Sequence, residues 1–165
     1  MHEQTNWSMV FMAGVNARMG QGNEALKALD TMSRVCVINN FFTLSNDWRR
    51  MGTVMCEDMR AAPFQIDGNC GFPGVVNEML LQSQNDELAI LPALPDRWPK
   101  GHMNGLLARG NILCDICWDE KQVEIRLRGN ARHKPVRLCS GYHFKDGSAV
   151  KQLDLRGETV LAAFR

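Results

Sequence analysis

The stretch that decides the fold is residues 63–74, which read PFQIDGNCGFPG and run into the apolar segment VVNEMLLQ at 75–82. Its three glycines and Pro73 argue against a regular helix or strand there, because glycine costs backbone entropy and proline lacks an amide donor. We therefore expect Asp67 and Asn69 on a bend, followed by a helix that begins near Pro73. A carboxylate and an amide placed this way are typical of a site that positions water or a sugar hydroxyl. Asp and Asn are also ordinary turn residues, so a plain turn remains the alternative.

Two helices are predicted before this stretch. The first covers residues 9–19, with one face formed by Trp7, Phe11, Val15 and Arg18. The second follows the Gly20-Gln21-Gly22 break, with Asn23 as its cap. Its apolar positions recur at helical spacing, namely Ala25, Leu26, Leu29 and Met32. The pattern then degrades over residues 33–62, which we read as a long loop or a short broken helix.

A third helix is predicted over residues 75–84, with Val76, Met79 and Leu80 facing inward. After it the sequence becomes rich in proline, and from residue 105 onward short segments alternate between apolar and polar side chains. This alternation predicts antiparallel strands at 112–118, 122–128, 136–139, 150–155 and 159–164. The chain is therefore predicted to be α+β, with helices of one domain at 1–88 and a small β-sandwich or meander at 89–165.

Composition excludes several classes of partner. The 165 residues carry 19 basic and 18 acidic side chains, a net charge of +1, and no long basic run. We therefore expect neither nucleic acid nor an anionic membrane surface as a partner. No apolar stretch approaches the roughly 18 residues of a membrane-spanning helix. Residues 1–4 lack the hydrophobic region of a signal peptide.

The cysteines and histidines do not form a recognisable metal motif. Six cysteines are spread irregularly, at positions 36, 56, 70, 114, 117 and 139. Free thiols are favoured over a disulfide framework, because a chain of this size does not need cross-links. Cys114 and Cys117 have zinc-like spacing but lie in a strand pattern, where residues three apart face opposite sides. The four histidines, at 2, 102, 133 and 143, form no i, i+4 ligand pair and are expected on the surface. No metal site and no cofactor is therefore predicted.

Four ordered motifs together resemble the C-terminal part of the family 95 glycoside hydrolases, which are α-L-fucosidases. The motifs are PFQIDGN at 63–69, EMLLQS at 78–83, LPALPDRWP at 91–99 and GLLARG at 105–110. The start of the chain also fits, through Trp7-Ser8 and Ala17-Arg18. The resemblance covers roughly residues 5–120.

This resemblance implies the last helices of an (α/α)6 catalytic barrel, followed by the C-terminal β-domain. It further implies hydrolysis of terminal α-L-fucosyl groups with inversion, and α-1,2 linkages in fucosylated glycans are the expected substrates. Asp67 matches the family aspartate that helps to hold the attacking water, and Asn69, Trp7 and Gln65 are the implied sugar-binding residues. The general acid belongs to segments before Met1, so the chain alone is predicted to be inactive. The alternative is a non-catalytic fragment that binds carbohydrate or acts as a scaffold.

Three positions depart from the family pattern: Cys70 replaces an aromatic residue, Met12 a lysine, and Asn6 a glycine. Because of these changes, another α-L-sugar in place of fucose is an alternative substrate. The resemblance also implies a partner, the remainder of the catalytic domain. Without it, apolar residues such as Phe11, Val15 and Leu29 would lack their cover, so self-association through the first forty residues is predicted. Members of the family are often secreted or periplasmic.

Overall fold

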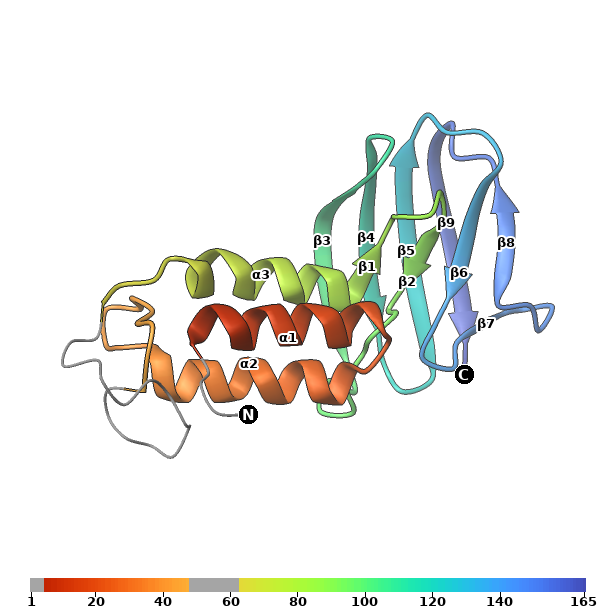
Figure 1. Cartoon of the computed structure of the whole chain (residues 1–165). Helices are drawn as coiled ribbons and strands as arrows, with labels where there is room; N and C mark the ends of the chain where they lie inside the picture. Colours follow the sequence, from red (N-terminus) through yellow and green to blue (C-terminus); the bar gives the residue numbers. More distant parts are fainter. Residues whose placement is uncertain (1–4, 48–62) are drawn as a thin grey trace. The chain divides into compact units, whose positions relative to one another are not determined.

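The structure is a computed structural model that describes residues 5–47 and 63–165 (Figure 1). Within these residues the helices are α1 (Asn6–Arg18), α2 (Gly22–Cys36) and α3 (Asp67–Leu80). The strands are β1 (Leu81–Gln82), β2 (Leu88–Ile90), β3 (Gly101–Ala108), β4 (Ile112–Trp118), β5 (Gln122–Gly129), β6 (Lys134–Leu138), β7 (His143–Phe144), β8 (Val150–Leu153) and β9 (Gly157–Phe164). The predicted α+β order, with helices first and a β-domain second, is confirmed.

Helix α1 buries a different face from the one that its large apolar residues suggest. Thr5 and Ser8 form a reciprocal capping box at its start, which satisfies two otherwise unpaired amides. The buried residues of the helix include none of its aromatic side chains; they are Asn6, Met9, Val10, Ala13 and Ala17. The predicted face of Trp7, Phe11 and Val15 is instead 52%, 59% and 42% exposed. The large side chains of α1 therefore form an apolar stripe on the surface of this chain.

Helix α2 follows the predicted periodicity, and its four predicted apolar positions are all buried. Two details of the prediction were wrong. The N-cap is Gln21 rather than Asn23, and the helix continues to Cys36 rather than ending near Ser33. In addition, Leu29 is fully buried, so it does not contribute to an uncovered surface.

Helix α3 begins at Asp67, so the prediction of a bend at Asp67 and Asn69 was wrong. The reason is tertiary packing that only glycine allows. A Cβ atom on Gly71 would lie 2.2 Å from Cγ1 of Val10, and one on Gly68 would lie 2.9 Å from Cγ2 of Thr43. The glycines lower helix propensity, but they let the backbone of α3 approach its neighbours closely. The helix also ends at Leu80, earlier than predicted, because the next two residues form β1.

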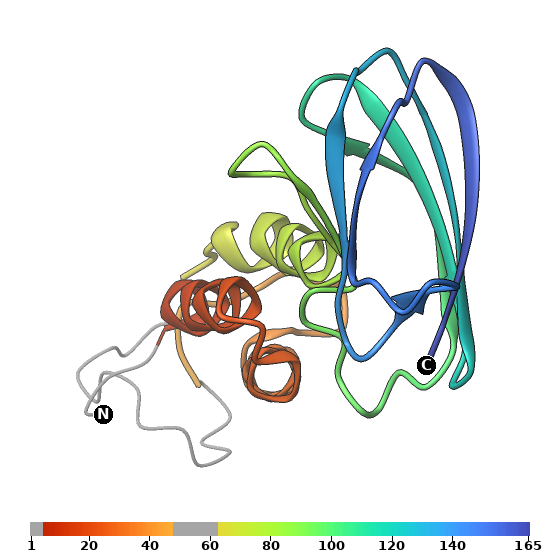
Figure 2. The same cartoon turned by 90° about the vertical axis from the view of Figure 1, so that its right-hand side faces the viewer.

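The chain divides into two compact units, one up to Val76 and one from Asn77 to Arg165. In the second unit, two sheets face each other (Figure 2). One sheet has the order β1-β2-β6-β8 and the other has the order β3-β4-β5-β9-β7. Alternate residues along each strand point inward; on β5 these are Val123, Ile125 and Leu127, all at most 1% exposed. The second unit is thus a β-sandwich with its own core. The predicted domain boundary after residue 88 stays a prediction.

The five predicted strands lie close to β4, β5, β6, β8 and β9. The short strand β7 was not predicted, and β3 was missed. Its sequence contains Gly105, which has a positive φ of 75° and sits in a shift of register between Met103 and Leu106. Such a bulge interrupts the alternation on which strand prediction depends. The short strand β2 was missed because its apolar run contains no polar alternation. It pairs in parallel with β6 and is buried on both faces.

The cysteines and histidines lie as the strand pattern indicates. Cys114 is buried and Cys117 is exposed, so they face opposite sides of β4. The described cysteines are free, and Cys56 lies outside the described residues, as does His2. His102, His133 and His143 are exposed. Among residues 5–47 and 63–165, no group of three His, Cys, Asp or Glu side chains is arranged to hold a metal ion. In the same residues, no helix has the length and apolar character needed to cross a membrane.

Candidate functional site

The predicted site residues gather where the first turns of α1 and α3 meet. Figure 1 shows the starts of these two helices at the same end of the helical unit. Asn6, the first residue of α1, is fully buried and joins two other segments through its side-chain amide. Its Nδ2 donates to the carbonyl oxygen of Leu44 at 2.9 Å and to that of Gln65 at 3.0 Å. Asn6 therefore fixes the segment that leads into α3 against the start of α1.

Trp7 and Gln65 are brought together by the same arrangement. The backbone amide of Trp7 donates to Oε1 of Gln65 at 3.3 Å. The indole of Trp7 is about half exposed and stacks on the ring of Phe11, with ring centroids 5.7 Å apart. An exposed, supported aromatic ring next to an amide side chain is a suitable surface for a sugar, which presents both an apolar face and hydroxyl groups.

Asp67 lies two residues after Gln65, in the first turn of α3. The backbone amide of Cys70 bonds the carbonyl of Ile66, so the helix starts without using the Asp67 carboxylate as its cap. Within the described residues, that carboxylate makes no hydrogen bond and no ion pair. Unpaired amides and the helix dipole favour a negative charge at this position. Asp67 thus lies at a fixed place in the backbone, and its carboxylate, which none of the described residues engages, is available to a ligand.

Asn69, in contrast, uses its side chain within the protein. Its Nδ2 donates to the carbonyl oxygen of Phe41 at 2.7 Å, and its Oδ1 lies 2.8 Å from the hydroxyl of Thr43. The backbone amide of Thr43 also donates to this Oδ1, at 3.3 Å. The structure therefore places Asn69 as a clamp on residues 41–43. Its predicted contact with a sugar stays a prediction.

Comparison with family models covers almost the whole chain. Residues 1–80 match the glycosyl hydrolase family 95 catalytic domain, and residues 82–157 match the glycoside hydrolase family 95, C-terminal domain. The chain belongs to glycoside hydrolase family 95. Its division into a catalytic part and a C-terminal part follows the order of helices and strands in the structure.

Two curated relatives carry fucosidase names. The chain is 56% identical over 59 residues to Alpha-L-fucosidase 2 of Arabidopsis thaliana, which is 35% of this chain and 7% of the relative. It is 29% identical over 93 residues to Probable alpha-fucosidase A of Aspergillus oryzae, which is 50% of this chain and 13% of the relative. This family 95 chain therefore spans only a small part of the length of either relative.

Sequence reasoning missed two residues that build the site. Thr43 lies in the segment read as a loop, where a single polar side chain gives no signal of its own. Its hydroxyl nevertheless lies within hydrogen-bond distance of both Gln65 and Asn69, and the residue is 2% exposed. Asn6 was noted only as a departure from a family glycine. Buried polar residues that link distant segments cannot be identified from sequence spacing, because the partners of Asn6 are 38 and 59 residues away and those of Thr43 are 22 and 26 residues away.

Proposed function

We propose that this family 95 chain is the C-terminal part of a glycosidase that hydrolyses terminal α-L-fucosyl groups. The finer assignment is to α-1,2 linkages, cleaved with inversion. The observation that carries the proposal is the grouping of Trp7, Gln65 and Asp67, in which the Asp67 carboxylate is free for a ligand. The names of the two relatives support the choice of fucose as the sugar.

Inversion needs two groups on opposite faces of the sugar ring. A general acid protonates the leaving oxygen, while a base-activated water attacks the anomeric carbon from the other side. We assign Asp67 to the water side, where its carboxylate accepts a hydrogen bond from the water and stabilises the positive charge that develops on the ring. The general acid is assigned to a part of the catalytic domain that lies outside this chain.

The other site residues bind or position the sugar. Trp7 offers its ring face, and Gln65 offers an amide next to that ring. Asn69 and Thr43 hold the segment on which Gln65 depends, because the Thr43 hydroxyl contacts the Gln65 carbonyl. A loss of this clamp would move Gln65 and Asp67 relative to Trp7.

The rest of the catalytic domain is the expected partner of the apolar stripe on α1. This stripe consists of Phe11, Val15 and Met19, which follow one another at i, i+4 spacing and are 42–65% exposed, while Trp7 at its end is reserved for the sugar. In an (α/α)6 barrel, neighbouring helices cover such a face. When the chain is made alone, we expect the stripe to cause self-association. The double variant Phe11→Lys, Val15→Lys should then increase the monomer fraction in sedimentation experiments, and an unchanged fraction would contradict this role.

A chimera tests the catalytic assignment. The chain replaces the matching segment of a complete family 95 fucosidase, and fucose release is measured with and without Asp67→Asn. General acid or base assistance contributes about 10²–10⁴ in rate, so kcat should fall by that range while KM changes little. Glu24→Gln, at an exposed carboxylate on α2, is the matched control and should leave kcat unchanged. Turnover of the Asp67→Asn chimera within about tenfold of its parent would reject the assignment.

The chain alone provides a second test. The purified 165-residue protein should not release fucose from an α-1,2-fucosylated oligosaccharide, because Asp67 can orient a water but cannot also protonate the leaving oxygen. Measurable fucose release by this protein would show that the general acid lies within the chain.

A further inference from the structure

The β-domain has a largely unpaired edge on β9, the fourth strand of its five-stranded sheet. On one side, β9 pairs with β5 over its full length, from Gln122↔Phe164 to Gly129↔Gly157. On the other side, its partner among the described residues is β7, which reaches only Ala163 and Phe164. Residues 158–162 of β9 thus present an open edge, although the strand is not the last in its sheet. Open edges of this kind are sites at which another strand can add to a sheet.

The sequence of β9 does not protect this edge. Four of the five open residues, 159–162, contain no charge and no proline, and the fifth, Glu158, is paired with Arg126 of the neighbouring strand β5 at 3.4 Å. Residues 159–164, TVLAAF, combine β-branched, aromatic and small apolar residues, which favour strand pairing. Natural sheets usually guard an exposed edge with lysine, proline or a covering loop. Residues 159–162 carry none of these devices, and the two lysines beside them, Lys145 and Lys151, come from other segments. An added strand is therefore a partner that fits this edge.

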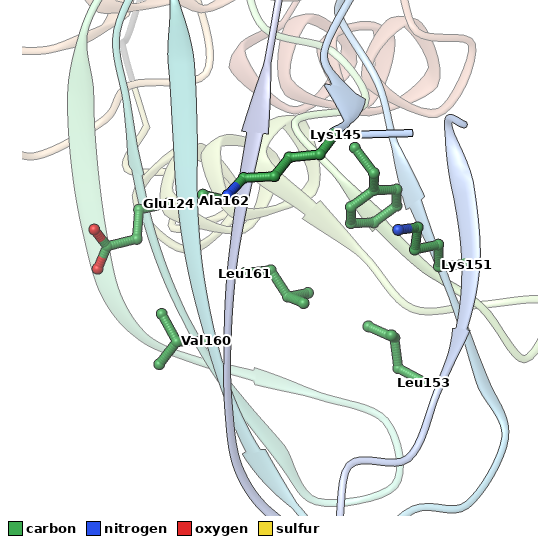
Figure 3. A pocket seen from close by; sticks show the side chains of 8 residues that line it. Glu124, Lys145, Lys151, Leu153, Val160, Leu161 and Ala162 are labelled. Atoms are coloured by element: carbon green, nitrogen blue, oxygen red, sulfur yellow. The ribbon is translucent and has the colours of Figure 1, made fainter. Parts of the chain in front are cut away.

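A groove beside β9 provides space for that strand. It has a volume of about 510 Å³ and runs along residues 160–162, opposite β8. In Figure 3, Val160 and Glu124 lie on one side of β9, while Leu161, Leu153 and Lys151 lie on the other side. Val160 is 55% exposed. Lys145 and Lys151 give the groove positive charge, and Lys151 is also paired with Asp146 at 2.8 Å.

We propose that the occupant of this edge is β9 of a second copy of the chain, paired antiparallel about a two-fold axis at Val160. Val160 is the midpoint of the open residues 158–162, so this register uses all of them. Each Glu158 then lies opposite Ala162 of the other copy, at the end of the groove that Lys145 lines. The carboxylate and the lysine have opposite charges, and no two like charges face each other directly. The dimer extends the five-stranded sheet across both copies and does not depend on the proposed fucosidase function.

The proposed dimer is tested by placing a charged side chain at residue 160, on the two-fold axis, and measuring the association of the protein. All proteins carry Phe11→Lys and Val15→Lys, which remove the separate contribution of the α1 stripe. In Val160→Glu the new carboxylate faces Arg126 within its own sheet, so the fold is retained. In the dimer, however, this carboxylate faces the same carboxylate of the second copy across the two-fold axis, and the two repel each other. A five-residue strand pair is a small, weak interface, so sedimentation equilibrium is measured up to roughly 0.1 mM protein.

We expect dimers in the parent and at least about tenfold weaker association in Val160→Glu. The matched control is Leu113→Glu, which also faces an arginine, Arg128, but lies on β4 between two paired strands. It should associate like the parent. Mixing Val160→Glu with Val160→Lys should restore association, because opposite charges then meet at the axis. A monomeric parent, or equal association of the parent and Val160→Glu, would overturn the proposal.

A cross-link tests the register. Residues directly opposite each other in an antiparallel pair have Cα atoms about 4.5–5.5 Å apart, within the range of a disulfide. Val160→Cys should therefore form a covalent dimer under mild oxidation, whereas Leu113→Cys should not. If Leu113→Cys cross-links as fast as Val160→Cys, the contact does not occur at the β9 edge.

Discussion

The helical unit and the β-domain are stabilised in different ways. In the β-domain, strands pair over long registers and bury alternate side chains, so the fold depends on many similar contacts. In the helical unit, the segment before α3 is held by a few buried polar groups, above all Asn6 and Thr43. The largest apolar residues of α1 stay on its surface. A site built on a few specific hydrogen bonds is well defined, but each bond is more critical than any single contact in the sheet.

The largest effect is expected from Asn6→Ala. This change removes the side-chain donor to the carbonyl of Leu44 and one of the two side-chain donors to the carbonyl of Gln65, which keeps the Thr43 hydroxyl. Leaving buried acceptors unpaired costs about 1–3 kcal/mol. Hydrogen exchange, measured peptide by peptide, should show faster exchange in the helical unit and no change in the β-domain. Asn77→Ala, at an exposed amide on α3, is the control. Equal hydrogen-exchange protection in Asn6→Ala and the parent protein would show that the hydrogen bonds of the Asn6 side chain do not stabilise the unit.

The next effect concerns the close approach of α3 to α1, and two glycines on the same helix provide a matched pair. Gly71→Ala places a methyl group 2.2 Å from Cγ1 of Val10, whose β-branched side chain has little rotamer freedom in a helix. Overpacking of this kind costs about 1–3 kcal/mol. Gly74→Ala meets no atom within 4 Å and should instead stabilise the helix, by up to about 1 kcal/mol. Unfolding in urea measures both changes, and a destabilising Gly74→Ala would contradict the packing argument.

The smallest effect is the response of the β-domain to acid. Arg156 holds the pKa of Asp154 at about 2, below its ordinary value. Lys151 and Ser148 lower the pKa of Asp146, and Lys134 lowers the pKa of Asp86. Because these pKa values are lower in the folded state, the carboxylates stabilise the fold fully above about pH 4. That contribution is lost as the pH falls towards about 2.

Thermal unfolding between these pH values measures the loss. The melting temperature of the β-domain, followed by hydrogen exchange or by Trp118 fluorescence, should decrease as the pH is lowered from about 4 to about 2. Asp154→Asn removes one of the titrating groups, so its melting temperature should depend less on pH. A variant with the same pH dependence as the parent protein would show that this carboxylate does not contribute.

The sequence predicted the strands better than it predicted the site, and the reason lies in the range of the contacts. Alternation in residues 112–118 and 122–128 is a local signal, and β4 and β5 follow it. The start of α3 depends on whether Gly68 and Gly71 have close neighbours, which no local pattern contains. The same holds for Asn6 and Thr43, whose partners lie far along the chain. Asp67 could be put forward as a site residue because its motif is recognisable as a whole, and its role stays a prediction.

The parallel pairing of β2 with β6 has a consequence for the speed of folding. It joins Leu88 to Val136, and the three strands β3, β4 and β5 lie between them in the sequence, whereas α1 and α2 contact each other across a short turn. Bringing distant segments together costs loop-closure entropy before their contacts can stabilise the chain. Folding rates therefore fall as contacts become less local. The helical hairpin can therefore form early, while the four-stranded sheet must wait for β6. During that interval the buried strand β2 has only β1 as a neighbour, and the Leu88–Ile90 backbone is open to incorrect pairing.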